Sequence, residues 1–303
     1  MLPNFIIAGA TASGTSFLTH LLMQHDDIYL PKDIESEPHF FSLSHRYARG
    51  IQSYQETWFS DWNKQKAIGE RSSTYLHFDK TAERLKKYLP NIKLIFVLRD
   101  PVDRAWAHYR YMVLRGLEEL DFRDALDLEK SRRDKELTNP AEKRHHDYTE
   151  RSLYGEQLEQ YLHFFSFDQI LILSSENLRQ HTRFQLNRVT NFLEVAPLDN
   201  FTYISEFTSV SVKDPSIQAK ILQHLGSKKT KAIVEAIRYK QKDLNIYIES
   251  ETDKKFIAEL INNLHESKEP LPPDIQTSLQ ERFKPDQTKF FDLTSGHIDF
   301  NSW

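Results

Sequence analysis

Residues 5 to 16 read Phe5-Ile6-Ile7-Ala8-Gly9-Ala10-Thr11-Ala12-Ser13-Gly14-Thr15-Ser16, and this stretch decides the fold of the 303-residue chain. Its first four residues form an uninterrupted apolar run, which is typical of a parallel strand buried on both faces. After the turn, apolar residues recur on one helical face at Phe17, Leu18, Leu21 and Leu22. The stretch therefore predicts a strand, a tight loop and a helix.

The loop has the glycine spacing G-x-x-x-x-G of a phosphate-binding loop, with glycines at Gly9 and Gly14. Its backbone amides and those of the first helical turn are expected to point at one anion. The alternative is an ordinary glycine-rich connection in which Thr15 or Ser16 caps the helix. A kinase or ATPase would need lysine at Thr15 and an acidic magnesium ligand after a later strand. Asp100 is the only acid considered for that role, but Arg99 precedes it and places a cation where a magnesium ligand would be needed.

Two more apolar runs predict parallel strands, at residues 94–98 and 170–173. Helical patterns flank them at 79–89, 102–114, 155–164 and 184–192. Alternating strands and helices predict an α/β fold with a central parallel β-sheet flanked by helices.

The C-terminal third is mostly helical and polar. Residues 201–268 are expected to form a helical insertion or lid within a single domain that spans residues 1–303. Residues 269–273 contain three prolines and form the best linker candidate, and a final helix is expected at 274–282.

Composition excludes several classes of protein. The 40 Lys and Arg against 44 Asp and Glu give a net charge of −4, so no global basic field favours nucleic acid. The chain has no cysteine, which excludes disulfides and thiolate chemistry. It also has no long apolar run and no basic leader before the first strand, so neither a membrane segment nor a signal peptide is expected. A cytoplasmic location is expected if the protein is bacterial, and a lumenal protein without its leader is the alternative.

Several stretches resemble the sulfotransferase family, whose members move a sulfuryl group from 3′-phosphoadenosine 5′-phosphosulfate (PAPS) to a hydroxyl or amine and release 3′,5′-bisphosphorylated adenosine (PAP). In family order they are the loop above, Ser36-Glu37-Pro38-His39-Phe40-Phe41, Gly69-Glu70-Arg71-Ser72-Ser73-Thr74-Tyr75-Leu76, Leu98-Arg99-Asp100-Pro101-Val102-Asp103-Arg104-Ala105, and residues 154–193. Residues 279–286, Gly296 and Trp303 resemble the ending of bacterial and glycan-type members. The resemblance implies a P-loop-like sulfotransferase fold that needs no metal.

The resemblance also implies roles for individual residues at the donor site. The loop residues would cradle the 5′ end of the nucleotide: Ala10, Thr11, Ala12, Ser13, Gly14, Thr15 and Ser16. Arg99 would pair with the 3′-phosphate, since a cation at the carboxyl end of a parallel strand lies where such sheets bind ligands. The alternative for Arg99 is a surface ion pair with Asp103.

The resemblance further implies two roles at the reacting centre. Glu37 matches the general base that takes the acceptor's proton, and His39 is its rival, because an unperturbed histidine titrates closer to neutral pH. Glu37 needs partial burial to act as a base, which Phe40 and Phe41 are expected to supply. Arg71 stands where the family commonly has lysine and would clamp the sulfonate oxygens. The alternatives are a solvated carboxylate for Glu37, a packed histidine for His39, and for Arg71 an ion pair with Glu70 or a neighbouring acid.

Three residues depart from the family pattern. Ala12 stands where the loop normally has lysine or arginine, Ser36 replaces a common lysine, and Ala107 replaces a serine that binds the 3′-phosphate. Losing one preorganised donor at the leaving group costs about 2.7–4 kcal/mol of transition-state stabilisation. Substitute cations are expected among Arg71, Lys32 and Lys213.

Two functions therefore stay open. The first is in-line sulfuryl transfer from PAPS to a hydroxyl or amine, with a carbohydrate or small metabolite as acceptor. The second is a catalytically impaired homologue that still binds the nucleotide. The basic segments Arg132-Arg133 and Lys143-Arg144-His145-His146 are candidates for the lining of an acidic-sugar cleft, and solvated faces are the alternative. The sequence predicts no oligomeric state.

Overall fold

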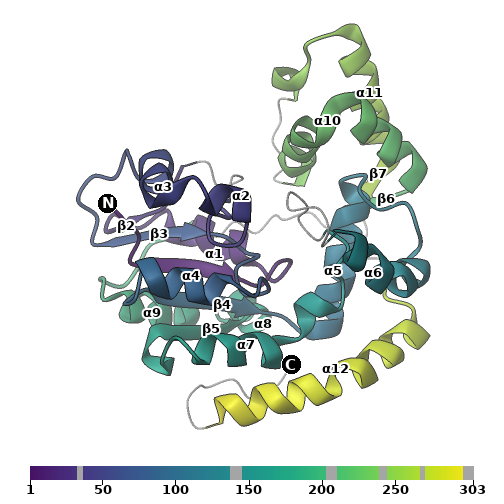
Figure 1. Cartoon of the computed structure of the whole chain (residues 1–303). Coiled ribbons are helices and arrows are strands. Elements are labelled where there is room, and N and C mark those ends of the chain that lie inside the picture. The colour runs from purple at the N-terminus through teal and green to yellow at the C-terminus, as the bar shows by residue number, and fades with distance from the viewer. Residues whose placement is uncertain (33–36, 137–144, 203–209, 239–243, 267–269, 296–303) are drawn as a thin grey trace.

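A parallel sheet forms the centre of the protein, whose structure is a computed structural model describing residues 1–32, 37–136, 145–202, 210–238, 244–266 and 270–295 (Figure 1). The strand order is β2-β3-β1-β4-β5. The bounds are β1 Phe5–Gly9, β2 Ile28–Tyr29, β3 Ala67–Arg71, β4 Lys93–Leu98 and β5 Ile170–Ser174. The predicted α/β architecture is thus confirmed, and the three strands expected from apolar runs are β1, β4 and β5.

Helices cover both faces of this sheet. Side chains of β1 alternate between them, because successive residues of a strand point to opposite sides. Phe5 and Ile7 pack against α1 (Thr15–Leu22), α8 (Ser175–Gln180) and α9 (Thr182–Leu193). Ile6 and Ala8 belong to the core that includes α3 (Gly50–Trp58), α4 (Thr81–Tyr88) and α7 (Tyr154–Leu162). Because both faces of the sheet are buried at β1, this strand has an uninterrupted apolar run.

The remaining helices lie beside the sheet (Figure 1). α5 (Pro101–Leu114) follows β4, and α6 (Phe122–Glu136) packs on it. α2 (Ser44–Tyr47) precedes α3, and a 3₁₀ turn at Glu150–Ser152 precedes α7. None of the helices in the described ranges combines the length and apolar character needed to cross a bilayer.

The described part of residues 201–268 contains two strands as well as the expected helices. α10 (Pro215–Arg238) is broken at Gly226, and α11 (Glu251–Asn263) packs against it. β6 (Val210–Val212) and β7 (Leu264–Glu266) pair antiparallel at the base of the two helices. The buried side chain of Gln218 donates a hydrogen bond to the backbone oxygen of Leu114, which ties α10 to the end of α5.

The final helix is longer than predicted. α12 runs over Pro273–Thr294 and passes through Pro285, where the sequence indicated a stop after residue 282. Its Asp286 carboxylate accepts hydrogen bonds from the Gly155 and Glu156 amides, at 2.9 Å each. These amides belong to the first turn of α7 and have no acceptor within their own helix. A Cβ on Gly155 would lie 2.6 Å from the Asp286 backbone oxygen, so close packing explains this glycine.

Candidate functional site

The loop after β1 lies at the carboxyl edge of the sheet, beside the segment that follows β4. β1 and β4 are neighbouring parallel strands, and the Ala10 amide bonds the Val97 backbone oxygen at 2.8 Å. The N-cap of α1 is Gly14, with φ of 95° and no side-chain cap hydrogen bond, and Thr15 and Ser16 lie within the helix. The capping role considered for Thr15 and Ser16 is therefore not observed. The first amides of α1 are left for an anion, because a helix offers them no carbonyl.

Arg99 lies directly beyond β4, next to this loop. Its side chain is one-third exposed, at 33%, and Nη2 lies 3.6 Å from Asp103 Oδ2. The ion pair with Asp103 thus exists, but the exposure of both side chains makes it weak. Asp100 accepts hydrogen bonds from the Val102 and Asp103 amides at 2.9 Å and serves as the cap of α5. That role uses Oδ1 of the acid that was considered as a magnesium ligand. Ala107 is partly buried on α5.

Glu37, Arg71 and Ser16 form a chain of contacts that ends at the loop. Arg71 Nη1 lies 2.9 Å from Glu37 Oε1 and donates to Ser16 Oγ at 2.7 Å. Arg71 is the last residue of β3, the neighbour of β1, and Ser16 belongs to the first turn of α1. The carboxylate, the guanidinium and the glycine-rich loop that the sequence singled out separately are therefore connected through these contacts.

Ser73 and His39 complete the surroundings of the Glu37 carboxylate. The Ser73 amide donates to Oε2 at 2.8 Å, and Ser73 Oγ lies 2.9 Å from Oε2 and 3.0 Å from Oε1. His39 Nε2 lies 3.3 Å from Oε2, while its Nδ1 contacts Thr74 Oγ1 at 2.8 Å. Glu37 and His39 hence lie in direct contact, and both line the same pocket.

The charge state of Glu37 differs from the sequence expectation. Burial alone would raise its pKa, but Arg71, His39 and the two Ser73 groups outweigh burial and lower the pKa to about 2. Phe40 and Phe41 pack into the core against Tyr54. Glu37 is ionised throughout the physiological range as a result.

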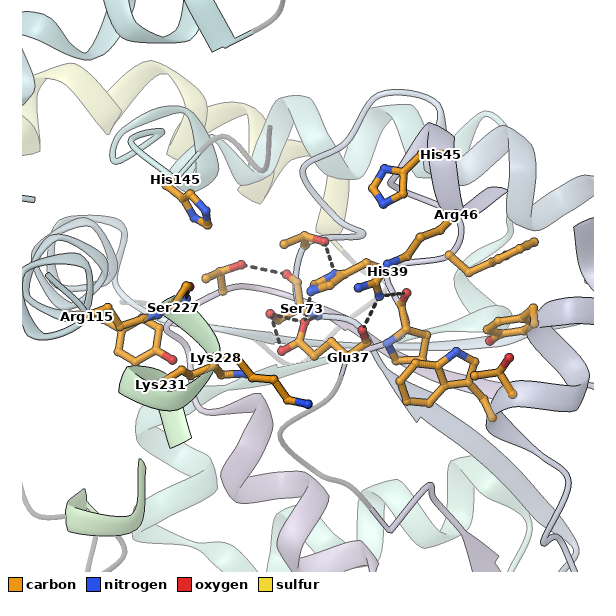
Figure 2. A pocket seen from close by; sticks show the side chains of 18 of the residues that line it. Glu37, His39, His45, Arg46, Ser73, Arg115, His145, Ser227, Lys228 and Lys231 are labelled. Atoms are coloured by element: carbon orange, nitrogen blue, oxygen red, sulfur yellow. Dashed lines mark hydrogen bonds and ion pairs between the residues drawn. The ribbon is translucent and has the colours of Figure 1, made fainter. Parts of the chain in front are cut away.

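A pocket of about 740 Å³ opens over the Glu37–His39 pair (Figure 2). Helix α10 contributes Lys228 and Lys231, which Figure 2 shows across the pocket from Arg46 and His45. Glu37 is the one carboxylate among the described residues of its lining. The basic side chains that line it are Arg46, Arg49, Arg115, Arg151, Lys228, Lys231, His39, His45, His108 and His145.

Sequence reasoning missed most of these cations. Of the basic segments it named, His145 lines the pocket, whereas Arg132 pairs with Glu118 and Arg133 pairs with Glu150. Ser36, Gly296, Trp303, Lys143 and Arg144 lie outside the described residues. No sequence pattern marked the six Arg and Lys side chains of the lining, because α2, α5, α10 and the turn before α7 meet only in the folded chain.

Two of the proposed substitute cations lie elsewhere. Lys32 is exposed beside Asp61, with Nζ 3.7 Å from Oδ2, and Lys213 donates to the Asn262 backbone oxygen at 2.7 Å. Neither lines the pocket. Among the described residues, no group of three or more histidine or acidic side chains is arranged to hold a metal ion.

A sequence model of the sulfotransferase domain matches residues 2–257. The chain is 37% identical over 114 residues to the membrane-associated sulfotransferase kil1 of Dictyostelium discoideum, covering 37% of this chain and 23% of that protein. It is 29% identical over 196 residues to heparan sulfate glucosamine 3-O-sulfotransferase 5 of Mus musculus, covering 65% of this chain and 54% of the relative. The chain thus spans about half or less of these relatives' length.

A solved structure has the same fold over almost the whole chain. The sulfotransferase from Alicyclobacillus acidocaldarius matches with a TM-score of 0.68 and 24% identity, covering 99% of this chain and 98% of that one. The central parallel sheet with flanking helices is therefore the sulfotransferase fold.

Proposed function

The chain belongs to the sulfotransferase family, and from this premise we propose that it transfers a sulfuryl group from PAPS to a hydroxyl or amine of an acidic carbohydrate. One observation carries the proposal: the Glu37 carboxylate, the Arg71 guanidinium and the loop that begins α1 are joined by contacts of 2.9 and 2.7 Å. A base, a cation and an anion-binding loop at one point are the parts that in-line transfer requires.

Charge and backbone geometry at this edge of the sheet support its role as the donor site. The amides at the start of α1 receive the 5′ end of PAPS, and Arg99 receives its 3′-phosphate. Ala107 offers no hydroxyl to that phosphate, so Arg99 carries more of the recognition. The donor's two phosphorylated ends are then held by different strands, β1 and β4, which fixes the nucleotide across the sheet edge.

The reaction forms one bond, breaks another and transfers one proton. A lone pair of the acceptor oxygen or nitrogen forms a new bond to sulfur, and the bond between sulfur and the 5′-phosphate oxygen breaks. That oxygen keeps the bonding electrons and leaves as part of PAP. The acceptor's proton passes to the Glu37–His39 pair, and Arg71 stabilises the sulfonate oxygens during transfer.

The acceptor class follows from the lining of the pocket. Six Arg and Lys side chains line the pocket. Glu37 is the single carboxylate among the described lining residues. Such a cleft attracts anions and repels cations. The mouse relative named above is a heparan sulfate glucosamine sulfotransferase, which agrees with an acidic glycan. We assign α10, which belongs to the predicted insertion, the role of a pocket wall within a single domain.

Replacing Arg99 with alanine tests the donor site. We expect PAP affinity to fall about 10- to 100-fold, because a hydrogen bond to a charged group contributes about 1.5–3 kcal/mol. The affinity for 5′-AMP, which has no 3′-phosphate, should not change. Calorimetry with both nucleotides measures this, and Asp103→Asn is the matched control because it removes only the ion-pair partner. Equal losses for the two nucleotides would contradict the assignment of Arg99.

Reversing two charges on α10 tests the acceptor class. In the variant Lys228→Glu/Lys231→Glu we expect KM for an acidic glycan to rise about tenfold with little change in kcat, because binding is lost equally from ground and transition states. Initial rates with desulfated heparin and with a neutral oligosaccharide measure the effect. A rise in KM for the neutral acceptor as well would mean that the wall shapes the pocket without selecting charge.

The impaired-homologue alternative makes a separate prediction. Ala12 deprives the loop of its usual cation, so a chain without any substitute would bind PAP yet release no PAP from PAPS. Measuring PAP release over a panel of acceptors, after PAP binding has been established, separates the two functions.

A further inference from the structure

We propose that Arg151 supplies the positive charge that the loop lacks at Ala12, by contacting the oxygen that links sulfur to the 5′-phosphate of the donor. This inference rests on the proposed function. It adds a catalytic residue that the sequence motifs did not identify, and it explains how a loop without lysine can still stabilise the leaving group.

Arg151 reaches the loop at the residue next to Ala12. Its Nη1 donates to Thr11 Oγ1 at 3.0 Å, and Thr11 Oγ1 donates to the Ser73 backbone oxygen at 3.1 Å. Ser73 in turn holds the Glu37 carboxylate through its amide at 2.8 Å. The guanidinium is therefore connected to the loop on one side and to the residue that positions the base on the other.

Arg151 also lines the pocket that Glu37 and His39 line. Its side chain is at the boundary between the donor loop and the acceptor cleft, which is where the sulfonate must pass from one substrate to the other. The residue is only 4% exposed. A cation shielded from water acts on a nearby developing charge more strongly than an exposed one.

The segment that carries Arg151 is fixed to the core. Ser152 Oγ donates to the Pro101 backbone oxygen at 2.8 Å, and the Gln157 side chain donates to the Glu150 backbone oxygen at 2.8 Å. Burial, followed by the Arg151 charge, holds the pKa of the neighbouring His108 well below its usual range. Preorganised stabilisation of a transition state requires a charged group that is held in place and directed at the reacting atoms. The fixed segment and the positive charge of Arg151 meet this requirement.

Arg71 is the main rival as the substitute cation. It already bridges Glu37 and Ser16, on the side of the loop where α1 begins. It also replaces a residue that is commonly lysine in the family, so it fills an existing role. Arg151 is the cation that the chain adds next to Thr11, where the loop lacks one.

The chemical role is confined to the leaving group. As the bond between sulfur and the 5′-phosphate oxygen breaks, the electron pair passes to that oxygen, and the guanidinium stabilises the charge that develops there. The same oxygen belongs to the 5′-phosphate of PAP after transfer. Arg151 should therefore bind PAP through this phosphate, and a binding experiment can detect the contact without turnover.

The test compares two nucleotides by calorimetry, PAP and adenosine 3′-phosphate, which lacks the 5′-phosphate. We expect Arg151→Gln to weaken PAP binding about 10- to 100-fold and to leave adenosine 3′-phosphate binding unchanged. Adding Ala12→Lys should restore PAP affinity and the rate of PAP release from PAPS. Ala12 already has a φ of 66° with its Cβ in place, so lysine adds no new kind of backbone strain there.

The following controls distinguish a failure of the Arg151 assignment from a failure of the proposed function. Arg133→Gln removes a nearby arginine that does not line this pocket and should change neither affinity. If Arg151→Gln fails to fold, Arg151→Met, which also removes the charge, gives the same double-mutant cycle with and without Ala12→Lys. Unchanged PAP affinity in a folded Arg151→Gln variant would overturn the inference alone. A native protein that binds no PAP would overturn the proposed function.

Discussion

Replacing Glu37 with glutamine is expected to lower kcat/KM for sulfuryl transfer about 10²- to 10⁴-fold, the usual contribution of a positioned acid or base. Glutamine keeps the shape of the side chain and can still accept the Ser73 hydrogen bonds at 2.8 and 2.9 Å. It cannot take a proton from the acceptor. PAP affinity should stay within about twofold of the native value, because Glu37 faces the acceptor pocket.

Rates with saturating PAPS, together with calorimetry for PAP, measure this prediction. Glu83→Gln is the matched control, since Glu83 is an exposed acid in the first turn of α4. His39→Gln separates the two members of the pair. A loss of activity in His39→Gln that equals or exceeds the loss in Glu37→Gln would move the role of base to the histidine.

Replacing Arg71 with glutamine is expected to lower kcat about 10²- to 10³-fold, because the transferring sulfonate loses a preorganised cation. The substitution also alters the pH dependence. Arg71 is the largest of the groups that lower the pKa of Glu37, and burial alone would raise it. The acidic limb of the kcat/KM profile should therefore move to higher pH in Arg71→Gln.

The native profile gives the reference for that shift. With the pKa of Glu37 at about 2, kcat/KM should show no acidic limb from this group above about pH 4. Arg71→Lys keeps the charge and should retain most of the rate and the native profile. A profile that stays unchanged in Arg71→Gln would mean that the guanidinium does not control the base.

The sequence predicted the strands that are apolar throughout but missed β3. The β3 residues Ala67-Ile68-Gly69-Glu70-Arg71 include two charged residues, yet Glu70 is fully buried. Burial raises the pKa of Glu70 to about 7, although hydrogen bonds from its neighbours oppose the rise, and Tyr54 donates to it at 3.1 Å. A strand that buries a carboxyl in this way has no apolar run to reveal it.

The last helix continues beyond the predicted end at residue 282 and passes through Pro285. Proline inside a helix removes one backbone hydrogen bond, so a helix that continues through Pro285 needs stabilisation from elsewhere. The tertiary contact between Asp286 and the first turn of α7 favours continuation. Packing against a neighbouring helix overrides a local preference of this size, and no window of sequence contains that neighbour.

The sequence identified several residues of the site separately, and the structure shows which of them are in contact. Motif resemblance identified Glu37, Arg71 and the loop, but only strand pairing explains why Arg71 reaches Ser16. The lysines of α10 had no signal beyond helical spacing, because their place in the pocket depends on how α10 packs against α5. Arg151 was missed because its partner, Thr11, is far away in sequence.

One measurement tests the central claim most directly: calorimetric titration of the native protein with PAP in the presence of EDTA. The account predicts binding of one PAP per chain without magnesium, and a weaker response to ATP with or without magnesium. Absence of PAP binding, together with magnesium-dependent binding of ATP, would contradict the assignment of the loop and of Arg99 to a sulfuryl donor.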